Sequence, residues 1–270
     1  MKNSRKIISI IGLLIVIVAY FFQQKKSSSA YPTIMGDEQI EIGLDFNYLP
    51  TSTTGVIVNH KGYNLSYSEA HEQAEWVAYS LRETDISYID RKRPYFIYDP
   101  KVKTKSAHWR SYKNSGYDRG HLCPAGDRRL TEELYNETFY TSNVTPQQHD
   151  FNSGIWNTLE QKTRYWAKKY KRIYVVTGGI LTDSNLKSIG KDKVSVPKAF
   201  YKVILDYTEP EIKAIAFLFP HEDSNRPLYE FVVSIDELEQ KTGIDFFPEL
   251  PDDIENKLEA YSNYKNWSFR

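Results

Sequence analysis

The sequence predicts a globular α+β fold, with strands and helices around one large core. A length of 270 residues is enough for a single domain of this kind. Aromatic residues make up 14% of the chain, and short apolar runs are spread along it, which excludes a disordered polymer. Segments of strand composition and segments of helical spacing both occur. The single cysteine, Cys123, cannot form an internal disulfide and therefore does not indicate the redox compartment.

The N-terminus carries an export or anchoring signal. Residues 7–22 form an uninterrupted apolar run, with basic residues on both sides. The run lies between the length of a secretory signal core and that of a membrane-spanning helix. We expect residues 1–26 to be an uncleaved transmembrane signal anchor that places the folded domain outside the cytoplasm, in the periplasm or at the cell surface. Cleavage after the run would instead release a secreted protein.

Residues 27–50 lack clear periodicity and contain a run of serines, which is typical of a tether. The folded domain is expected to cover residues 51–270. Its predicted strands cover residues 55–60 and 63–66, joined at Lys61-Gly62, and then 76–81, 173–177, 199–205, 212–219 and 231–235, with an extended piece at 139–144.

The predicted helices in this domain begin at recognisable capping residues. Asp150 is expected to cap a long helix that runs to about Tyr170, and Ser234 with Glu237 forms a capping box for a helix that stops at Gly243. A short helical turn at 69–74, a helix at 131–138 and a last helix opening at Pro251 complete the prediction.

The formal net charge is zero, which excludes a polycation that coats nucleic acid by bulk charge. The basic residues are nevertheless concentrated. Between Arg91 and Arg129 there are eleven Lys or Arg and three Asp, a local excess of eight positive charges. Such a run can be an ordinary solvated face. Its position around a candidate reactive motif favours a local phosphate-binding field.

That motif is Asp118-Arg119-Gly120-His121, which is followed by Leu-Cys-Pro-Ala. A histidine can take a proton from water near neutral pH. An arginine presents a fixed fork of donors to two phosphate oxygens. The glycine is expected to let the backbone turn. These are the groups needed to attack a phosphodiester. The alternative is that Asp118 forms an ordinary surface ion pair and that His121 is a loop histidine.

Three further blocks follow in order: Ser142-Asn-Val-Thr-Pro-Gln147, the segment from Asn152 through Trp156 to Glu160, and Val175-Val-Thr-Gly178. Leu250-Pro-Asp-Asp253 closes the series. With these blocks the chain, from about Val56 to Leu258, resembles the DNA/RNA non-specific endonuclease family, the sugar-non-specific nucleases that include mitochondrial endonuclease G. The resemblance implies a mixed α/β domain, a central antiparallel sheet flanked by helices, and a ββα-metal (His-Me finger) active site.

The resemblance also implies roles for individual residues. His121 would be the general base, and Arg119 would lie near the scissile phosphate. Asn152 would be the only direct protein ligand of one Mg²⁺ ion, with Mn²⁺ or another divalent cation as a substitute. Glu160 would hold a metal-bound water, and Asn143 would orient the histidine segment. Ser153 and Cys123 depart from the family pattern, but neither replaces a catalytic group.

Substrate contacts are predicted upstream of the motif. The family uses a second arginine to hold the phosphate, and Arg93 aligns with it best, with Arg91 as the alternative. Arg110 and Trp109 lie in the same basic segment. Trp109 is the best candidate there for stacking on a base, although packing is the commoner role of a tryptophan.

We therefore expect a magnesium-dependent endonuclease that hydrolyses DNA and RNA without sequence preference. Two alternatives stay open: a catalytically silent surface module that binds polyanions, and a phosphodiesterase for smaller phosphate diesters. The expected partners are DNA and RNA as substrates and the membrane through the N-terminal segment. A homodimer or a protein inhibitor is left open by the sequence.

Overall fold

The computed structural model describes residues 47–208, 210–261 and 263–269. The predicted signal anchor and most of the tether lie outside these residues. Within the described residues, no helix is long and apolar enough to cross a membrane.

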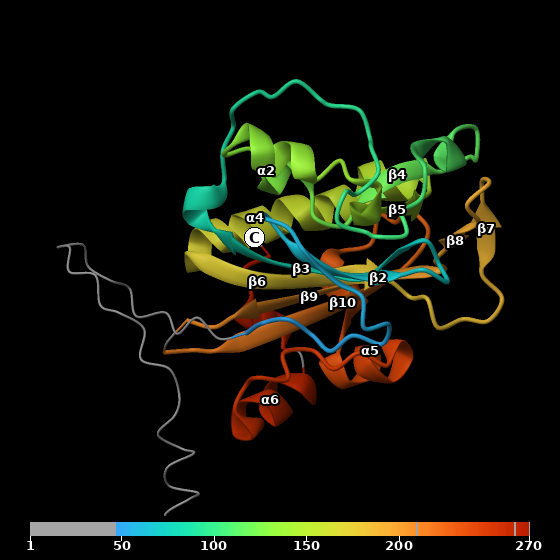
Figure 1. Ribbon diagram of the computed structural model, residues 1–270. Coiled ribbons are helices and arrows are strands. Elements are labelled where there is room, and N and C mark those ends of the chain that lie inside the picture. Colours follow the sequence, from blue (N-terminus) through green and yellow to red (C-terminus); the bar gives the residue numbers. More distant parts are fainter. Residues whose placement is uncertain (1–46, 209, 262, 270) are drawn as a thin grey trace, which may run out of the picture. The chain divides into compact units, whose positions relative to one another are not determined.

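The centre of the fold is a seven-stranded sheet with the order β1-β2-β3-β6-β9-β10-β11, in which every neighbouring pair is antiparallel (Figure 1). The strands are β1 (Ile57–Asn59), β2 (Asn64–Ser68), β3 (Gln73–Arg82), β6 (Arg172–Gly179), β9 (Ala199–Asp206), β10 (Lys213–Pro220) and β11 (Val232–Val233). The sheet confirms the predicted α+β class with a central antiparallel sheet.

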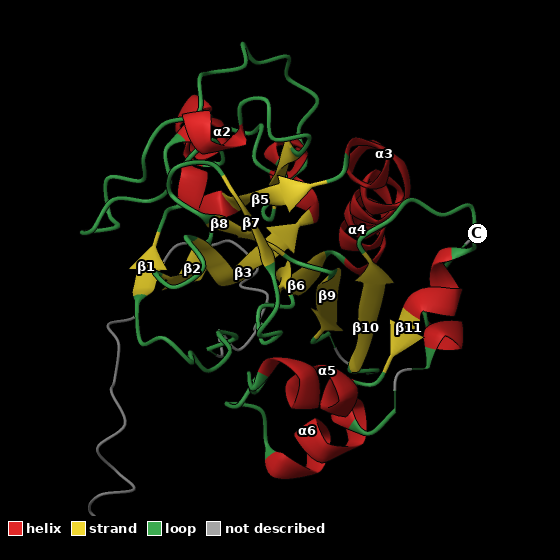
Figure 2. Ribbon diagram, turned by 90° about the vertical axis from the view of Figure 1, so that its right-hand side faces the viewer, coloured by secondary structure: helices red, strands yellow, loops and turns green. Residues whose placement is uncertain are grey.

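Helices cover both faces of this sheet. In Figures 1 and 2, α2 (Glu132–Glu137) and α4 (Asn157–Tyr170) lie on one side, and α5 (Ile235–Thr242) and α6 (Asp252–Glu259) lie on the other. Successive side chains of a strand point to opposite faces, so Val77 and Tyr79 join the core under α4 while Trp76 and Ala78 join the core over α5. Burial on both faces explains why the strands read as nearly continuous apolar runs.

The helix ends mostly follow the predicted capping chemistry. The Thr131 hydroxyl accepts a hydrogen bond from Leu134 N at the start of α2. The Ser234 hydroxyl accepts from Glu237 N at 3.1 Å, and Gly243 ends α5 in the left-handed conformation at φ 71°. The last helix begins directly after Pro251, as predicted.

Two short sheets lie outside the main one. The first pairs β4 (Asp118–His121) with β5 (Val144–Gln147), and the second pairs β7 (Lys187–Ile189) with β8 (Val194–Val196), all antiparallel. After β5 the chain enters a helix at α3 (His149–Phe151), passes through a wide turn at Asn152–Trp156 and continues as α4. The segment thus has the order strand, strand, helix.

Some local predictions were wrong. Residues 69–74 do not form a helical turn, because Glu72 has a positive φ of 54° and Gln73 already begins β3. Asp150 does not cap the long helix, because the helix begins at His149 and its N-cap residue is Gln148. Only Val232–Val233 of the predicted strand at 231–235 pairs with the sheet, because residues 228–231 form a 3₁₀ turn.

The expected backbone turn at Gly120 was also wrong. Gly120 lies inside β4, opposite Thr145, and a Cβ at this position would lie 2.0 Å from Oε1 of Gln147. The glycine is required because the buried Gln147 side chain crosses its Cα.

Gly120→Ala should therefore lower the free energy of unfolding by about 1–3 kcal/mol, the usual range for overpacking a buried site. Urea titration of wild type and variant measures the difference. Gly126→Ala is the matched control, because its Cβ would meet only the end of the Arg164 side chain, at 3.1 Å. Equal stability of the Gly120 variant and wild type would contradict this explanation.

Candidate active site

A cavity of about 660 Å³ opens between β4, the start of the long helix and the segment around Trp109. Its volume is typical of a ligand site. The residues that line it include Arg93, Trp109, Lys113, Arg119, His149 and Asn152. Segments distant in the sequence thus bring several predicted site residues to one cavity.

Asp118 joins β4 to the helix at this cavity. Its Oδ2 accepts hydrogen bonds from Asn152 Nδ2 at 3.0 Å and from His149 Nδ1 at 2.9 Å. The hydrogen bond to Asp118 raises the pKa of His149. Because the amide nitrogen of Asn152 is bound to Asp118, the orientation of the amide is fixed and its oxygen is left for another ligand.

The wide turn at Asn152–Trp156 is held by a loop that follows β10. Gly154 has φ −95° and ψ −110°, outside helical values. The Asp223 carboxylate occupies the space beside it: its Oδ1 accepts from Ile155 N at 3.0 Å and would lie 2.2 Å from a Cβ on Gly154. Wide helical turns of this kind are common at functional sites. Here the turn sets the direction of Asn152.

His221 holds the beginning of the same helix. Its Nε2 accepts from Gln148 N at 2.7 Å, while Nδ1 donates to the carbonyl oxygen of Pro197 at 2.8 Å. Burial lowers the pKa of His221, which keeps the ring neutral and able to accept. No local sequence pattern indicates this contact of His221 or that of Asp223.

His121 lies on β4 with its ring between Phe96 and Phe139, at centroid distances of 5.5 and 5.0 Å. Its Nε2 is enclosed and makes no hydrogen bond to any described residue. Burial, with Arg93 and Arg119 nearby, lowers the pKa of His121 to about 3. The imidazole is therefore neutral at physiological pH and has one nitrogen free to take a proton.

Two arginines flank the same aromatic ring. The guanidinium carbons of Arg119 and Arg93 lie 4.8 and 5.6 Å from the centroid of Phe96. Both side chains line the cavity, whereas Arg91 donates to the backbone oxygens of Arg129 and Leu130 instead. The geometry therefore favours Arg93 over Arg91 as the second phosphate-binding arginine.

Asn143 is fully buried and supports the segment that follows His121. Its Nδ2 donates to the backbone oxygens of Cys123 and Thr138, at 3.0 and 2.9 Å, and its Oδ1 accepts from Cys123 N at 2.8 Å. All polar groups of the side chain are thus used to fix backbone. This placement fits the predicted orienting role and leaves no group for substrate.

Glu160 lies one helical turn beyond Trp156, among buried charges. Burial raises the pKa of Glu160, and the ammonium of Lys202 opposes that rise. Lys202 is fully buried on β9, with Nζ 4.9 Å from the ring centroid of Trp156 and no hydrogen-bond partner among the described residues. Glu160 is not one of the residues that line the cavity, so its predicted contact with a metal-bound water stays a prediction.

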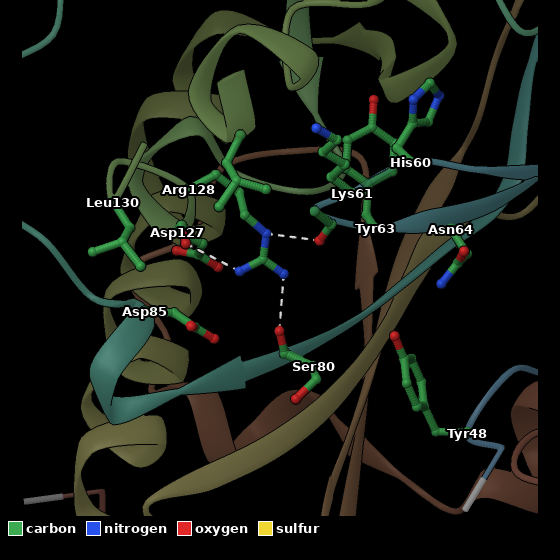
Figure 3. Close-up of a pocket in the computed structure, with 12 residues that line it drawn as sticks. Tyr48, His60, Lys61, Tyr63, Asn64, Ser80, Asp85, Asp127, Arg128 and Leu130 are labelled. Atoms are coloured by element: carbon green, nitrogen blue, oxygen red, sulfur yellow. Dashed lines mark hydrogen bonds between the residues drawn. The ribbon is translucent and has the colours of Figure 1, made fainter. Parts of the chain in front are cut away.

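A second, smaller cavity of about 160 Å³ lies beside Arg128 (Figure 3). The guanidinium there donates to the backbone oxygens of Gly62, Ser80 and Asp127. The Arg128 side chain therefore joins the strands to the loop after β4. Its role is structural, although it counts among the basic residues of the segment from Arg91 to Arg129.

Comparison with known proteins identifies the family of this chain. The chain is 39% identical to the mitochondrial nuclease EXOG of Danio rerio over 202 residues, which cover 69% of this chain and 59% of the relative. It is 34% identical to human mitochondrial endonuclease G over 206 residues, 71% of this chain and 69% of the relative. The chain thus spans about three fifths of the length of the EXOG relative.

A solved structure supports the fold independently. The crystal structure of the EndoG/EndoGI complex, described as showing the mechanism of EndoG inhibition, contains a chain with a TM-score of 0.68 and 31% sequence identity, covering 72% of this chain and 86% of that chain. The family profile described as DNA/RNA non-specific endonuclease matches residues 45–253. The chain therefore belongs to the DNA/RNA non-specific endonuclease family.

Proposed function

We propose that this protein is a metal-dependent endonuclease that hydrolyses phosphodiester bonds of DNA and RNA without sequence preference. The observation that carries the proposal is the link that Asp118 makes between the strand of Arg119 and His121 and the helix of Asn152. Two cations and an oxygen ligand line one cavity there, and His121 lies on the same strand as Arg119. The segment order of two strands and a helix supports assignment to the ββα-metal, or His-Me finger, type.

The residues present suit a hard divalent cation such as Mg²⁺. The amide oxygen of Asn152 is the donor that the Asp118 contact leaves available, and oxygen is the ligand that Mg²⁺ prefers. A single protein ligand also fits an ion that keeps most of its water shell. When bound, the ion would polarise the phosphate and stabilise the departing 3′ oxygen.

The side chains of this protein bind the phosphate and activate the water. The guanidinium groups of Arg93 and Arg119 bind the phosphate and stabilise the charge that develops on it. The imidazole of His121 takes a proton from the attacking water, which requires the neutral ring that the buried site maintains. Arg119 and His121 are two residues apart on β4 and so point to the same face. Contacts to phosphates carry no sequence information, so low specificity follows.

We also propose that residues 1–26 anchor the protein in a membrane with the nuclease domain outside the cytoplasm. The support is the apolar run at 7–22 with its basic flanks. Carbonate extraction of membranes from expressing cells tests the proposal, because an integral anchor stays in the pellet. The sequence and the structure leave a homodimer and a protein inhibitor open.

Supercoiled plasmid and RNA should both be cleaved by the full-length protein with Mg²⁺ and not with a chelator. His121→Ala should lower the cleavage rate by about 10²–10⁴-fold, the usual contribution of a general base. His71→Ala is the matched control, because this histidine follows β2, bonds Ser195 and does not line the cavity. Binding without turnover in wild type would favour the silent polyanion module, and cleavage of small diesters alone would favour the second alternative.

In the pH profile of kcat/KM, the loss of activity on the acidic side should lie well below pH 6.5, because the lowered pKa keeps His121 neutral in mild acid. We call this part of the profile the acidic limb. Arg93→Gln removes a positive neighbour and raises the pKa of His121, so the limb should move to higher pH. Profiles from pH 4 to 8 on a fluorescent oligonucleotide measure this. Lys92→Gln, one residue away, should leave the limb in place. A limb in the Arg93 variant that stays fixed or moves to lower pH contradicts the assignment.

Asp223→Asn should raise the Mg²⁺ concentration that gives half-maximal cleavage by about 10- to 100-fold, while the rate at saturating Mg²⁺ is largely kept. The reason is that Asp223 fixes the turn of Asn152 without touching substrate, and outer contacts of a metal ligand have effects of this size. Asp150→Asn, an exposed acid on the same helix, serves as the control. An unchanged metal requirement would show that Asp223 does not orient the ligand.

A further inference from the structure

A row of aromatic side chains leads from the protein surface to the cavity. Tyr98, which is 41% exposed, packs edge-on against His108 at 5.1 Å between ring centroids. The ring of His108 lies 5.5 Å from that of Trp109, inclined by 33°. Trp109 in turn lines the cavity together with Arg93 and Arg119. The proposed phosphate-binding groups and the end of this aromatic row therefore share one space.

The backbone under this row is fixed. His108 N and the Ser111 hydroxyl both donate to Oδ2 of Asp192, at 2.7 and 2.8 Å. Asp192 belongs to the hairpin between β7 and β8. In the same hairpin, Gly190 lies so close that a Cβ would be 2.3 Å from Cα of Ser111. The short 3₁₀ turn Trp109–Tyr112 is thus held against this hairpin, so the indole is presented without a large ordering cost on binding.

The exposed neighbour of Trp109 is a cation. The guanidinium carbon of Arg110 lies 4.9 Å from the indole centroid. A cation on an exposed aromatic face binds weakly, whereas base stacking on an aromatic side chain is the stronger contact. A base can therefore displace Arg110 from the ring, and the freed guanidinium can then bind a backbone phosphate.

We propose that Trp109, backed by His108 and Tyr98, is a stacking site for an unpaired nucleobase next to the scissile phosphate, so that unpaired stretches of the substrate bind more tightly than paired ones. This inference rests on the proposed nuclease function and adds a substrate class to it. Bases in a duplex are stacked on their neighbours and do not present a face to a lateral side chain. Every unpaired base has a π face, so the site adds affinity for single strands without sequence readout.

The test is binding in the presence of chelator, which prevents metal-dependent cleavage. Fluorescence anisotropy of the full-length protein measures its affinity for a single-stranded 12-mer and for the duplex of the same sequence. Trp109→Ala should weaken single-strand binding about 5- to 150-fold, the effect expected for one stacked base, and leave duplex binding nearly unchanged. Trp109→Phe should keep most of the affinity. Tyr261→Ala, a 72% exposed tyrosine in the C-terminal segment, is the control.

Equal losses for single strand and duplex, or no loss, would overturn the stacking site. A second measurement uses wild type alone and does not depend on the folding of a variant. A 5-iodouracil-containing single strand should photo-crosslink to Trp109 or Tyr98, and crosslinks found only elsewhere would also overturn the proposal. Both measurements are separate from catalysis: a wild type that binds in this way without metal-dependent cleavage would contradict only the nuclease function.

Discussion

The site depends first on the Asp118 carboxylate. It belongs to the short strand that carries Arg119 and His121, and its Oδ2 accepts hydrogen bonds from Asn152 and His149 on the helix. Among the residues that the structure describes, no other hydrogen bond joins this strand to the helix at the cavity. The same contact decides which atom of the Asn152 amide is available to an ion. Asp118 thus determines which polar group of Asn152 faces the cavity.

The surrounding fold holds the backbone on both sides of this contact in place. Gln147 crosses over Gly120 and sets the packing of β4 on β5, Asn143 fixes the backbone after His121, and Asp223 fixes the turn after Asn152. Each of these groups is held by residues distant in sequence. The proposed base, Arg119 and the proposed metal ligand are therefore positioned by paired strands and a helix, whereas Arg93 lies in a connecting segment.

Much of this could be predicted from the sequence, for identifiable reasons. The strand runs and the cap at Ser234 are local signals, and the spacing of the motif placed Arg119 and His121 together. His221 and Asp223 were missed because they act on residues about 70 positions away and belong to no local pattern. The alignment favoured Arg93 and left Arg91 as the alternative, and only the position of each guanidinium separates them. The role of Gly120 was misread because a glycine can be required either by a backbone turn or by the close approach of another side chain, and the sequence does not distinguish the two.

The division of roles between His121 and Asn152 is the central claim, and Mn²⁺ binding measured by electron paramagnetic resonance tests it most directly. Wild type should bind one ion in the absence of nucleic acid. His121→Ala should bind the ion as wild type does, because the histidine is the base and not a ligand, whereas Asn152→Ala should lose binding. Loss of the ion in the His121 variant, or wild-type binding in the Asn152 variant, would contradict the account.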